Sequence, residues 1–533
     1  MKRLIVTTLI LLAAAITITV VYFKNLNPPG VRTSQVMRSI PDNAAAVFEF
    51  NNEKGFYEIF KGSTLLGAVA GKDKLAALDS ARRLLLSAPQ LDHFFNGQNI
   101  FISIHPSNGN DINLLITTTA TNDFKIEDFI KLNTQPNSGL TITPIQNTVG
   151  AEYDVLIKSI NKHFYIIKKD YNIFAGSFSK ELIDQSILYR DDKNRNVFVP
   201  LPDQQNANSL ANLYINYAQL QPLFDQLFKN KNTDIFKSFK LLPAIAALSL
   251  NYKNDALMFN GFTTIQHNHT TGYLNLFAAQ QPVANHLKDI FPATTAYSIN
   301  FSVSDPQRFS ADLSQWHIRA GIGNEKNQLF SKIKAEAGLF LKPEFEHLLG
   351  NEFAVVTTRY QEKYAIISVK DGSKLLPLMM NISTMTNDNI GQFNYDKLPF
   401  YLLGDAFSIF RKPYFMIVDN YLVLATTASE LKSYSDTYYN RKFISKIDQY
   451  NQFDDLLAER SNVAFFINFK NSQPILKRDL KDAFYDAFEN QVPSWKSYYG
   501  AAYQFTASDK NFYTNFCMRL NTVDSTTVKS EAK

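Results

Sequence analysis

A short strand-like pattern occurs four times in this chain, and it constrains the fold more than any other feature. The copies are Val47–Phe50, Tyr214–Tyr217, Ser298–Phe301 and Phe466–Phe469. Apolar and polar residues alternate in each copy, which is the period of a half-buried strand. Six residues after the polar position stands a residue that favours a helix start: Gly55, Pro222, Pro306 and Pro474. We call each copy an opener, and we expect it to form a strand, a short turn and a helix.

Equivalent elements recur at a nearly constant separation along the chain. The separations are 251 residues for Glu49 and Asn300, 253 for Gly97 and Gly350, 250 for Tyr171 and Tyr421, and 252 for Asn216 and Asn468. One offset shared by separate elements indicates a tandem duplication of about 250 residues. Solenoid repeats are much shorter, at ~20–50 residues, so this is the duplication of a domain.

The repeat sets the predicted domain boundaries. The first copy covers 40–278, with a weaker internal break near 200–208, and the second copy covers 283–521. Residues 25–39 contain two prolines and a glycine in succession and are expected to form a tether. Residues 522–533 are small, polar and charged, and are expected to form a flexible tail.

Hairpins outnumber crossover-length helices in each copy, which favours antiparallel pairing. In the second opener Leu213, Ile215 and Tyr217 share one face of the strand, and Tyr214 and Asn216 share the other. One face is therefore apolar and the other partly polar, as in a sheet half open to water. The predicted fold class is α+β: an N-terminal transmembrane helix followed by two tandem copies of a largely antiparallel sheet with helices on one face.

The N-terminal segment is expected to anchor the chain in a membrane. An uncharged, almost wholly apolar run of 20 residues extends from Leu4 to Phe23, which is long enough to span a bilayer. A cleaved signal peptide is the alternative, with Ala13–Ala15 as its cleavage site, but the apolar run continues beyond it. Lys2 and Arg3 precede the span and favour a cytoplasmic N-terminus. Residues 1–24 are therefore predicted to anchor the chain in the cytoplasmic (inner) membrane, with the remainder in the periplasm.

Composition and motifs exclude several classes of function. The formal net charge of +5 is spread over 533 residues without a long Lys/Arg run, so no nucleic-acid partner is predicted. The single cysteine, Cys517, excludes an intramolecular disulfide and a cysteine-based zinc site. Nucleophile-elbow, zincin, P-loop and dinucleotide-binding motifs are absent. We therefore predict no catalytic residues and no cofactor.

The polar position of the opener is the one recurrent polar feature. Its four residues, Glu49, Asn216, Asn300 and Asn468, are candidates for a shared polar surface. The alternative is that each occupies a solvent-facing or edge position that tolerates a polar side chain.

Two other patterns have residue types that could carry chemistry. His267 and His269 would point the same way on a strand, but no third metal ligand can be named and the second copy lacks them, so no metal site is predicted. They remain an asymmetric polar pair to inspect. Ser159–Lys162 and Ser331–Lys334 have the serine-x-x-lysine spacing of penicillin-interacting enzymes. The two copies do not align under the duplication and lack the companion motifs.

One resemblance concerns the layout of the whole chain. Ile40–Phe50 reads Ile-Pro-Asp-Asn-Ala-Ala-Ala-Val-Phe-Glu-Phe, after an apolar span and a tether and before long α+β repeats. This arrangement resembles an uncharacterised family of single-pass bacterial envelope proteins, a domain of unknown function. The resemblance implies an envelope location and supplies no functional residues.

The expected function is that of a non-enzymatic, membrane-anchored envelope protein that binds a protein or polymer outside the cytoplasm. Two alternatives stay open. One is an envelope hydrolase or transferase acting on glycan or peptide. The other is a chaperone-like envelope assembly factor that presents apolar surface to its clients.

Overall fold

The computed structural model describes residues 35–53, 72–107, 112–134, 138–146, 150–188, 197–199, 201, 209–230, 242–253, 255–266, 272–386, 389–490 and 495–521. The predicted span Leu4–Phe23 and the predicted tail 522–533 lie outside these ranges. Within them, no helix is both long and apolar enough to cross a membrane.

Among the described residues of the first half, ten strands belong to the main sheet: β1 (Ala46–Asn51), β2 (Asn99–Pro106), β3 (Ile112–Thr119), β4 (Leu140–Ile145), β5 (Ala151–Ile157), β6 (Lys162–Lys168), β7 (Ile173–Ser177), β8 (Ala211–Asn216), β9 (Ala244–Lys253) and β10 (Ala256–Ile265). The second half contributes β12 (Thr295–Ser302), β13 (Leu349–Thr358), β14 (Lys363–Val369), β15 (Ser383–Met385), β16 (Gly391–Phe393), β17 (Tyr414–Val418), β18 (Tyr421–Ala425), β20 (Val463–Asn468), β21 (Tyr498–Ser508) and β22 (Asn511–Leu520). A separate two-stranded pair is formed by β11 (Val283–Ala284) and β19 (Arg460–Ser461).

The α-helices of the first half are α5 (Lys72–Leu85), α6 (Asp92–Phe95), α7 (Ile126–Ile130), α8 (Lys180–Leu188) and α9 (Leu220–Leu227). Those of the second half are α11 (Pro306–Arg319), α12 (Gly323–Ala337), α13 (Leu341–Leu348), α14 (Gly372–Asn381), α15 (Leu398–Leu403), α16 (Ala428–Tyr439), α17 (Asp448–Asp454), α18 (Phe469–Asp479) and α19 (Asp482–Asn490). Three 3-10 helices matter below: η4 (Tyr217–Gln219), η6 (Tyr273–Ala279) and η7 (Leu287–Ile290).

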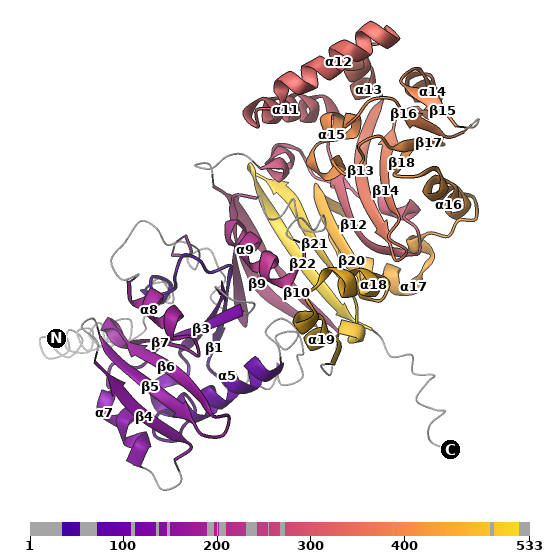
Figure 1. Cartoon of the computed structure of the whole chain (residues 1–533). Helices are drawn as coiled ribbons and strands as arrows, with labels where there is room; N and C mark the ends of the chain where they lie inside the picture. The colour runs from indigo at the N-terminus through magenta and orange to yellow at the C-terminus, as the bar shows by residue number, and fades with distance from the viewer. Residues whose placement is uncertain are drawn as a thin grey trace, which may run out of the picture.

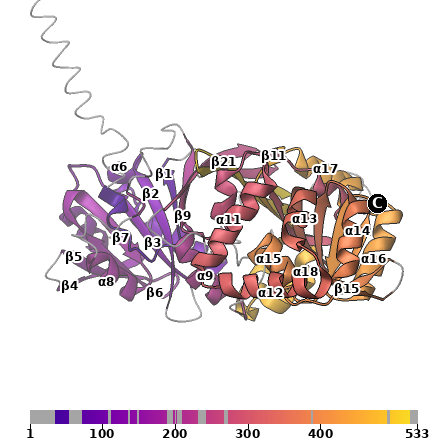
Figure 2. The same ribbon diagram turned by 90° about the horizontal axis from the view of Figure 1, so that it is seen from above.

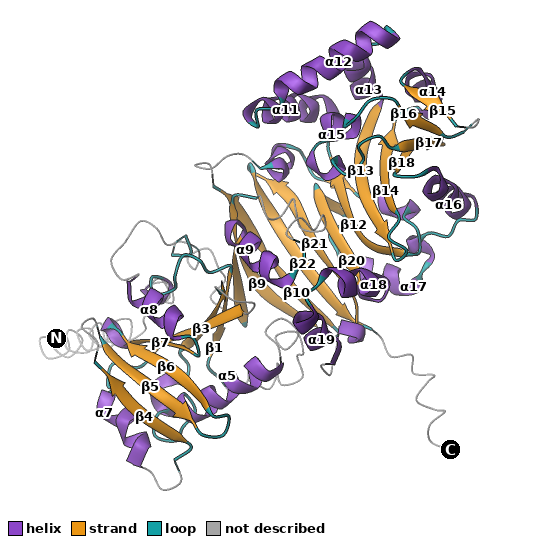
Figure 3. Cartoon of the chain, in the orientation of Figure 1, coloured by secondary structure: helices purple, strands orange, loops and turns teal. Residues whose placement is uncertain are grey.

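The 20 strands of the main sheet pair without a break through the described residues (Figures 1 and 3). From one edge to the other the order is β4-β5-β6-β7-β3-β2-β1-β8-β9-β10-β22-β21-β20-β12-β13-β14-β18-β17-β16-β15, and every pairing is antiparallel. The second half of this order repeats the first in reverse, with β1 corresponding to β12 and β8 to β20.

Strand registers are the same in the two halves. Glu49 in β1 lies opposite Asn212 in β8, and Asn300 in β12 lies opposite Ala464 in β20. Asn300 and Ala464 are 251 and 252 residues after Glu49 and Asn212. These pairings agree with those that the sequence offsets predict. Register is strongly specified here because a slip of one residue would turn every side chain to the other face.

The halves meet along β10 and β22, near the middle of Figure 1, in a pseudo-twofold arrangement. Asn260 faces Asn515, its counterpart 255 residues later. Beside the sheet, an isolated bridge joins Phe228 to Leu480, which are 252 residues apart. In both pairs a residue meets its own equivalent, so both pairs lie on the pseudo-twofold axis.

The predicted fold class is wrong in its two separate sheets and in its one-sided helical layer, and the predicted membrane helix lies outside the described residues. No membrane-spanning helix is found in the part of the chain that the structure describes. The two copies share one sheet because each would otherwise leave a long edge strand with unpaired backbone groups, and β10 and β22 satisfy each other.

Helices cover both faces of the sheet (Figure 2). Several strands bury successive residues, which point to opposite faces, so both faces need a cover. In β13, Phe353 packs in a core with residues of α11, α12 and α13. The next residue, Ala354, packs with residues of α16 and α17 on the opposite face. The alternation of the opener predicts one apolar face, but these strands have two.

Part of the predicted tether and the predicted break between the halves belong to the core. Val36 and Met37 are buried against strand residues of the first half. The 3-10 helix η6 precedes the second half, and its Phe277 ring stacks on Phe301 with a centroid distance of 5.1 Å. The connection is therefore packed against the second half.

The helix starts predicted near the prolines of the openers are right for α11 and α9 and wrong for α18. Helix α11 begins at Pro306, and Asp305 caps it by accepting a hydrogen bond from the Arg308 backbone amide (3.0 Å). Helices α9 and α18 begin before Pro222 and Pro474, and Pro474 lies inside α18. The first opener's Gly55 lies outside the described residues.

Candidate binding groove

The candidate polar surface predicted from the openers does not exist as a surface. Glu49, Asn216, Asn300 and Asn468 are all buried, with 5–7 % of each residue exposed. Their polar groups bond to neighbouring residues of the chain instead. The structure therefore corrects this prediction, and each residue has a local role.

In the first and third openers, the polar residue takes part in a hydrogen bond between a carboxylate and a carboxamide. The two halves place the acid and the amide on opposite strands of the pair. Asn99 in β2 donates to the Glu49 carboxylate in β1 (2.8 Å). In the second half, Asn300 in β12 donates to the Glu352 carboxylate in β13 (3.1 Å). Asn300 corresponds to Glu49, and Glu352 corresponds to Asn99, so the acid has moved to the neighbouring strand while the hydrogen bond stays.

The two carboxylates find their other donors differently. Glu49 accepts from the Asn212 amide (3.1 Å) and the Tyr214 hydroxyl (2.6 Å). Burial raises its pKa, and hydrogen bonds from Tyr214, Asn212 and Asn99 oppose that rise. Glu352 instead accepts from the backbone amides of His286 and Leu287, where η7 begins. Both acids therefore have their acceptor oxygens bonded inside the fold.

In the second and fourth openers, the polar residue ends the strand and caps the helix. Asn468 accepts a hydrogen bond from the Asn471 backbone amide (2.9 Å) at the start of α18. Asn216 accepts from the Ala218 amide (3.2 Å) at the start of η4. The side-chain oxygen satisfies a backbone donor that has no partner within the helix.

The remaining sequence candidates are placed as follows. His267 and His269 lie outside the described residues, and the described residues contain no group of three potential metal ligands. Ser159 and Lys162 lie at the turn between β5 and β6, where no helix aligns them. Ser331 and Lys334 lie on α12 and line a groove.

That groove lies between α11, α12 and α13. These helices lie together at the top of Figure 1. Its volume is about 360 Å³. Its wall combines lysines and small polar residues with apolar side chains. The lining residues include Ser314, Ile318, Lys326, Phe330, Lys334 and Phe340.

Lys326 is the most unusual residue of the groove. Only 5 % of it is exposed, and it forms no ion pair with a carboxylate among the described residues. Its ammonium donates to the Ser314 hydroxyl (2.8 Å) and lies 3.4 Å from His317 Nδ1. Burial and the nearby Lys342 ammonium lower the pKa of Lys326 to about 8. Burial and then Lys326 lower the pKa of His317 to about 3, so its neutral ring can accept this hydrogen bond.

The rest of the groove adds positive charge and apolar surface. Lys334 Nζ lies 4.3 Å from the centre of the Phe340 ring and also has no carboxylate partner in the described ranges. Lys342 is paired with Glu346 at 2.7 Å. Ile318 and Phe340 are 59 % and 57 % exposed at the rim. Two ammonium groups without carboxylates beside exposed apolar side chains suit an anionic group carried by an apolar neighbour.

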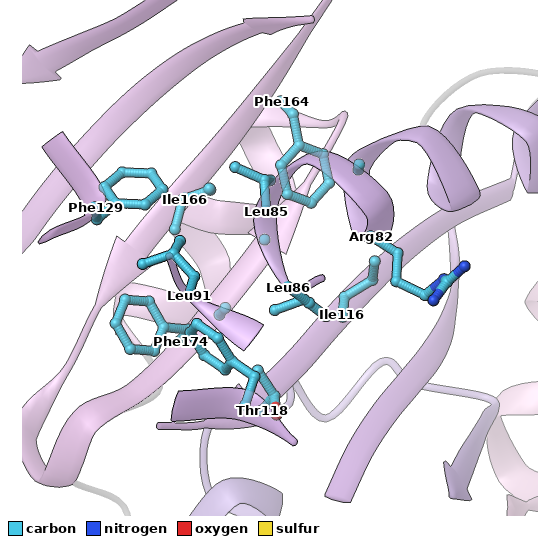
Figure 4. Close-up of a pocket in the computed structure, with 14 residues that line it drawn as sticks. Arg82, Leu85, Leu86, Leu91, Ile116, Thr118, Phe129, Phe164, Ile166 and Phe174 are labelled. Atoms are coloured by element: carbon cyan, nitrogen blue, oxygen red, sulfur yellow. The ribbon is translucent and has the colours of Figure 1, made fainter. Parts of the chain in front are cut away.

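A smaller cavity lies in the first half between α5, α6 and strands β3, β6 and β7 (Figure 4). Its walls include Leu85, Leu91, Phe129, Ile166 and Phe174. The Arg82 guanidinium points away from the other lining side chains in Figure 4 and pairs with Asp79 (2.9 Å). The cavity holds about 50 Å³, well below the ~150 Å³ of an apolar cavity that admits benzene. It is a packing void.

The sequence prediction missed the groove, although a signal was available. Lys326, Phe330 and Lys334 are spaced four residues apart and so lie on one face of α12. A helix face on which lysine alternates with an aromatic residue indicates a face that borders the protein surface. Its neighbours on α11 and α13 could not be known from spacing alone.

Comparison of the whole chain with protein-family models, curated proteins and solved structures finds no match. The resemblance to an uncharacterised envelope family therefore stays a prediction, and function must be argued from the site.

Proposed function

We propose that this chain is a non-enzymatic envelope protein that binds a protein partner outside the cytoplasm. The groove between α11, α12 and α13 would receive an acidic segment of that partner. The observation that carries the proposal is the pair Lys326 and Lys334, which face one groove without a carboxylate among the described residues.

Charge complementarity supports an acidic partner. A carboxylate between two ammonium groups would form charge-assisted hydrogen bonds, which are stronger than neutral ones. The buried Lys326 ammonium would gain a carboxylate partner, which it lacks among the described residues. An apolar side chain beside the acid would cover Ile318 and Phe340, which are exposed in the free chain.

The location outside the cytoplasm rests on the apolar run at the N-terminus and stays a prediction. The chaperone-like alternative has less support, because the exposed large apolar residues, such as Ile130, Phe262 and Tyr439, are scattered over both halves.

The hydrolase alternative has one specific observation in its favour. A serine hydroxyl hydrogen-bonded to a lysine of lowered pKa is a nucleophile–base arrangement. However, the Ser314 hydroxyl donates to the Ser310 carbonyl (2.8 Å), so Lys326 is the donor in their contact. Ser314→Ala would leave partner binding largely intact if the groove only binds, and would abolish turnover if the groove is catalytic.

The test is site-specific photo-crosslinking in cells. A photoreactive residue replaces Asn327 or Phe340 in the groove, and replaces Tyr439 on α16 as the control, because α16 packs on the opposite face of the sheet. We expect groove positions to crosslink to an Asp/Glu-rich peptide identified by mass spectrometry. The Tyr439 position should not yield this adduct.

A charge reversal supplies the specificity control. Lys334→Glu should remove the adduct at position 327, whereas Lys432→Glu on α16 should not. Because Lys326 loses its charge above a pKa of about 8, binding should also weaken as the pH rises from 7 to 9. An adduct that is unchanged in Lys334→Glu would overturn the proposal.

A further inference from the structure

A second pocket lies in the first half, where the ends of β2 and β3 meet α8 and α9. It measures about 260 Å³. Its polar wall consists of Asn43, Asn113, Glu181, Gln185 and Gln226. Among the described residues, no lysine or arginine lines it, in contrast to the groove on α11, α12 and α13.

A buried histidine, His105, contacts Asn43 in the wall of the pocket. His105 has no exposed surface, and its two ring nitrogens contact Asn43 Oδ1 (2.7 Å) and Ser103 Oγ (2.8 Å). Burial lowers the pKa of His105 to about 3, so the ring stays neutral and needs one donor and one acceptor. This contact fixes the Asn43 carboxamide at the pocket wall.

Three hydrogen bonds made by polar side chains of the pocket are long. Asn43 donates to Gln185 at 3.3 Å, and Gln185 donates to Glu181 at 3.4 Å. Asn113 donates to Ser179 at 3.3 Å. All three exceed the usual 2.7–3.2 Å range of N–H···O bonds, so a ligand hydroxyl could replace them at little cost.

The equivalent place in the second half carries larger side chains. Arg478 stands where the first half has Gln226, and Tyr360 stands where it has Ser107. Arg478 bonds to Gln361, and the Arg359 guanidinium lies 4.7 Å from the centre of the Tyr360 ring. In both halves a side chain of the helix bonds to the hairpin. Gln226 bonds to the Ser107 carbonyl in the first half, and Arg478 bonds to Gln361 in the second. The halves differ in what fills the space beside this contact.

We propose that this first-half pocket binds one uncharged sugar residue. A sugar hydroxyl both donates and accepts, as do the carboxamides of Asn43, Asn113, Gln185 and Gln226. The rings of Pro106 and Pro222 offer apolar surface to the C–H face of a sugar. The volume lies just below the ~300–1,000 Å³ of pockets for drug-sized ligands, which suits a single residue.

The proposal is independent of the groove and is tested on the full chain with two probes, glucose and N-acetylglucosamine. Binding is followed by saturation-transfer NMR over a concentration series. We expect saturable binding of at least one sugar. Gln185→Ala should weaken it by about tenfold, the value of one hydrogen bond of ~1.4 kcal/mol.

A pocket-closing variant gives the second arm. Gln226→Arg places the residue of the second half in the first-half pocket and should abolish the signal. Gln315→Ala, an exposed glutamine on α11, is the matched control and should bind as the unchanged chain does. Unfolding temperatures confirm that each variant is folded. No saturable signal from either sugar, or equal binding by Gln226→Arg, overturns the proposal.

Discussion

At the scale of single residues, the structure holds a carboxylate in its interior with neutral donors alone. Glu49 accepts from two carboxamides and from the Tyr214 hydroxyl, and no cation is within ion-pair distance among the described residues. Such a group survives burial only because its acceptor sites are filled. The second half has Phe466 where the first has Tyr214, and its acid has moved to β13, beside backbone donors.

Tyr214→Phe should destabilise the protein by about 1.5–3 kcal/mol at pH 7, because it removes a donor from a buried carboxylate. The burial-raised pKa of Glu49 means that this carboxyl favours folding most below its ordinary pKa of 4.5 and loses that contribution as the pH rises. The effect of Tyr214→Phe should therefore be smaller at pH 4 than at pH 7. Urea unfolding at both pH values measures it. Tyr439→Phe, at a residue 74 % exposed, should change stability by less than about 0.5 kcal/mol.

His105 should make the protein sensitive to acid. Its pKa is about 3 in the fold against an ordinary value of 6.5, so the unfolded chain binds the proton more readily. The contribution of His105 to stability is full above pH 6.5 and is lost as the pH falls toward 3, by up to ~1.4 kcal/mol per pH unit. His105→Gln should flatten the decline of the urea midpoint between pH 7 and pH 4. An unchanged slope would contradict this account.

At the scale of elements, the polar residue of the fourth opener explains why α18 starts before its proline. Asn468 ends β20 and caps α18 in one position, so the helix begins at once and Pro474 falls inside it. The proline rule indicates where a helix may begin, and the capping side chain decides where it does.

Asn468→Ala should cost about 0.5–2 kcal/mol of stability, because the Asn471 amide loses its acceptor. Thermal or urea unfolding would show it. Asn451→Ala, at an exposed asparagine inside α17, is the comparison and should have little effect.

The apolar void under α5 gives a second test at this scale. Leu85→Ala would enlarge the cavity of Figure 4 and should destabilise the first half by about 2.7–5 kcal/mol. The enlarged space should then admit benzene, which would raise the unfolding temperature of the variant alone. A benzene effect on the unchanged chain would mean that the void is larger than the geometry shows.

At the scale of the whole molecule, the two halves behave as an intrachain pseudo-dimer. They share the β10–β22 pairing and a core that includes Phe259 of the first half and Phe505 of the second. Each half alone would expose a long edge strand and the apolar surface beside it.

Residues 1–280 and 281–533, expressed as two chains, should therefore assemble with each other and be poorly soluble apart. Co-purification through a tag on one half measures assembly. Phe259→Asp, at a buried seam position, should abolish it. Two soluble monomeric halves would contradict the shared-sheet account.

Much of this architecture could be predicted from local patterns. The hairpins after Gly97 and Gly350 and the strands of the four openers appear in the structure at the predicted offset, because alternation and turn residues act over a few positions. The two-faced burial of β13 and β14 could also have been suspected from their continuous apolar runs. The groove could not be predicted, because its walls come from three helices. Residue spacing does not show how those helices pack against one another.

The sequence by itself determined the strands, their registers and the repeat, because side-chain alternation and turn chemistry are local. Only the tertiary structure decided that the copies share one sheet, that Glu49 and its equivalents are buried, and that Lys326 and Lys334 face one groove. The physical reason is that burial and partner choice depend on residues hundreds of positions apart. From the sequence alone, Glu49 is expected at the surface. Its burial depends on the hydrogen bonds that Asn99, Asn212 and Tyr214 donate to it in the folded chain.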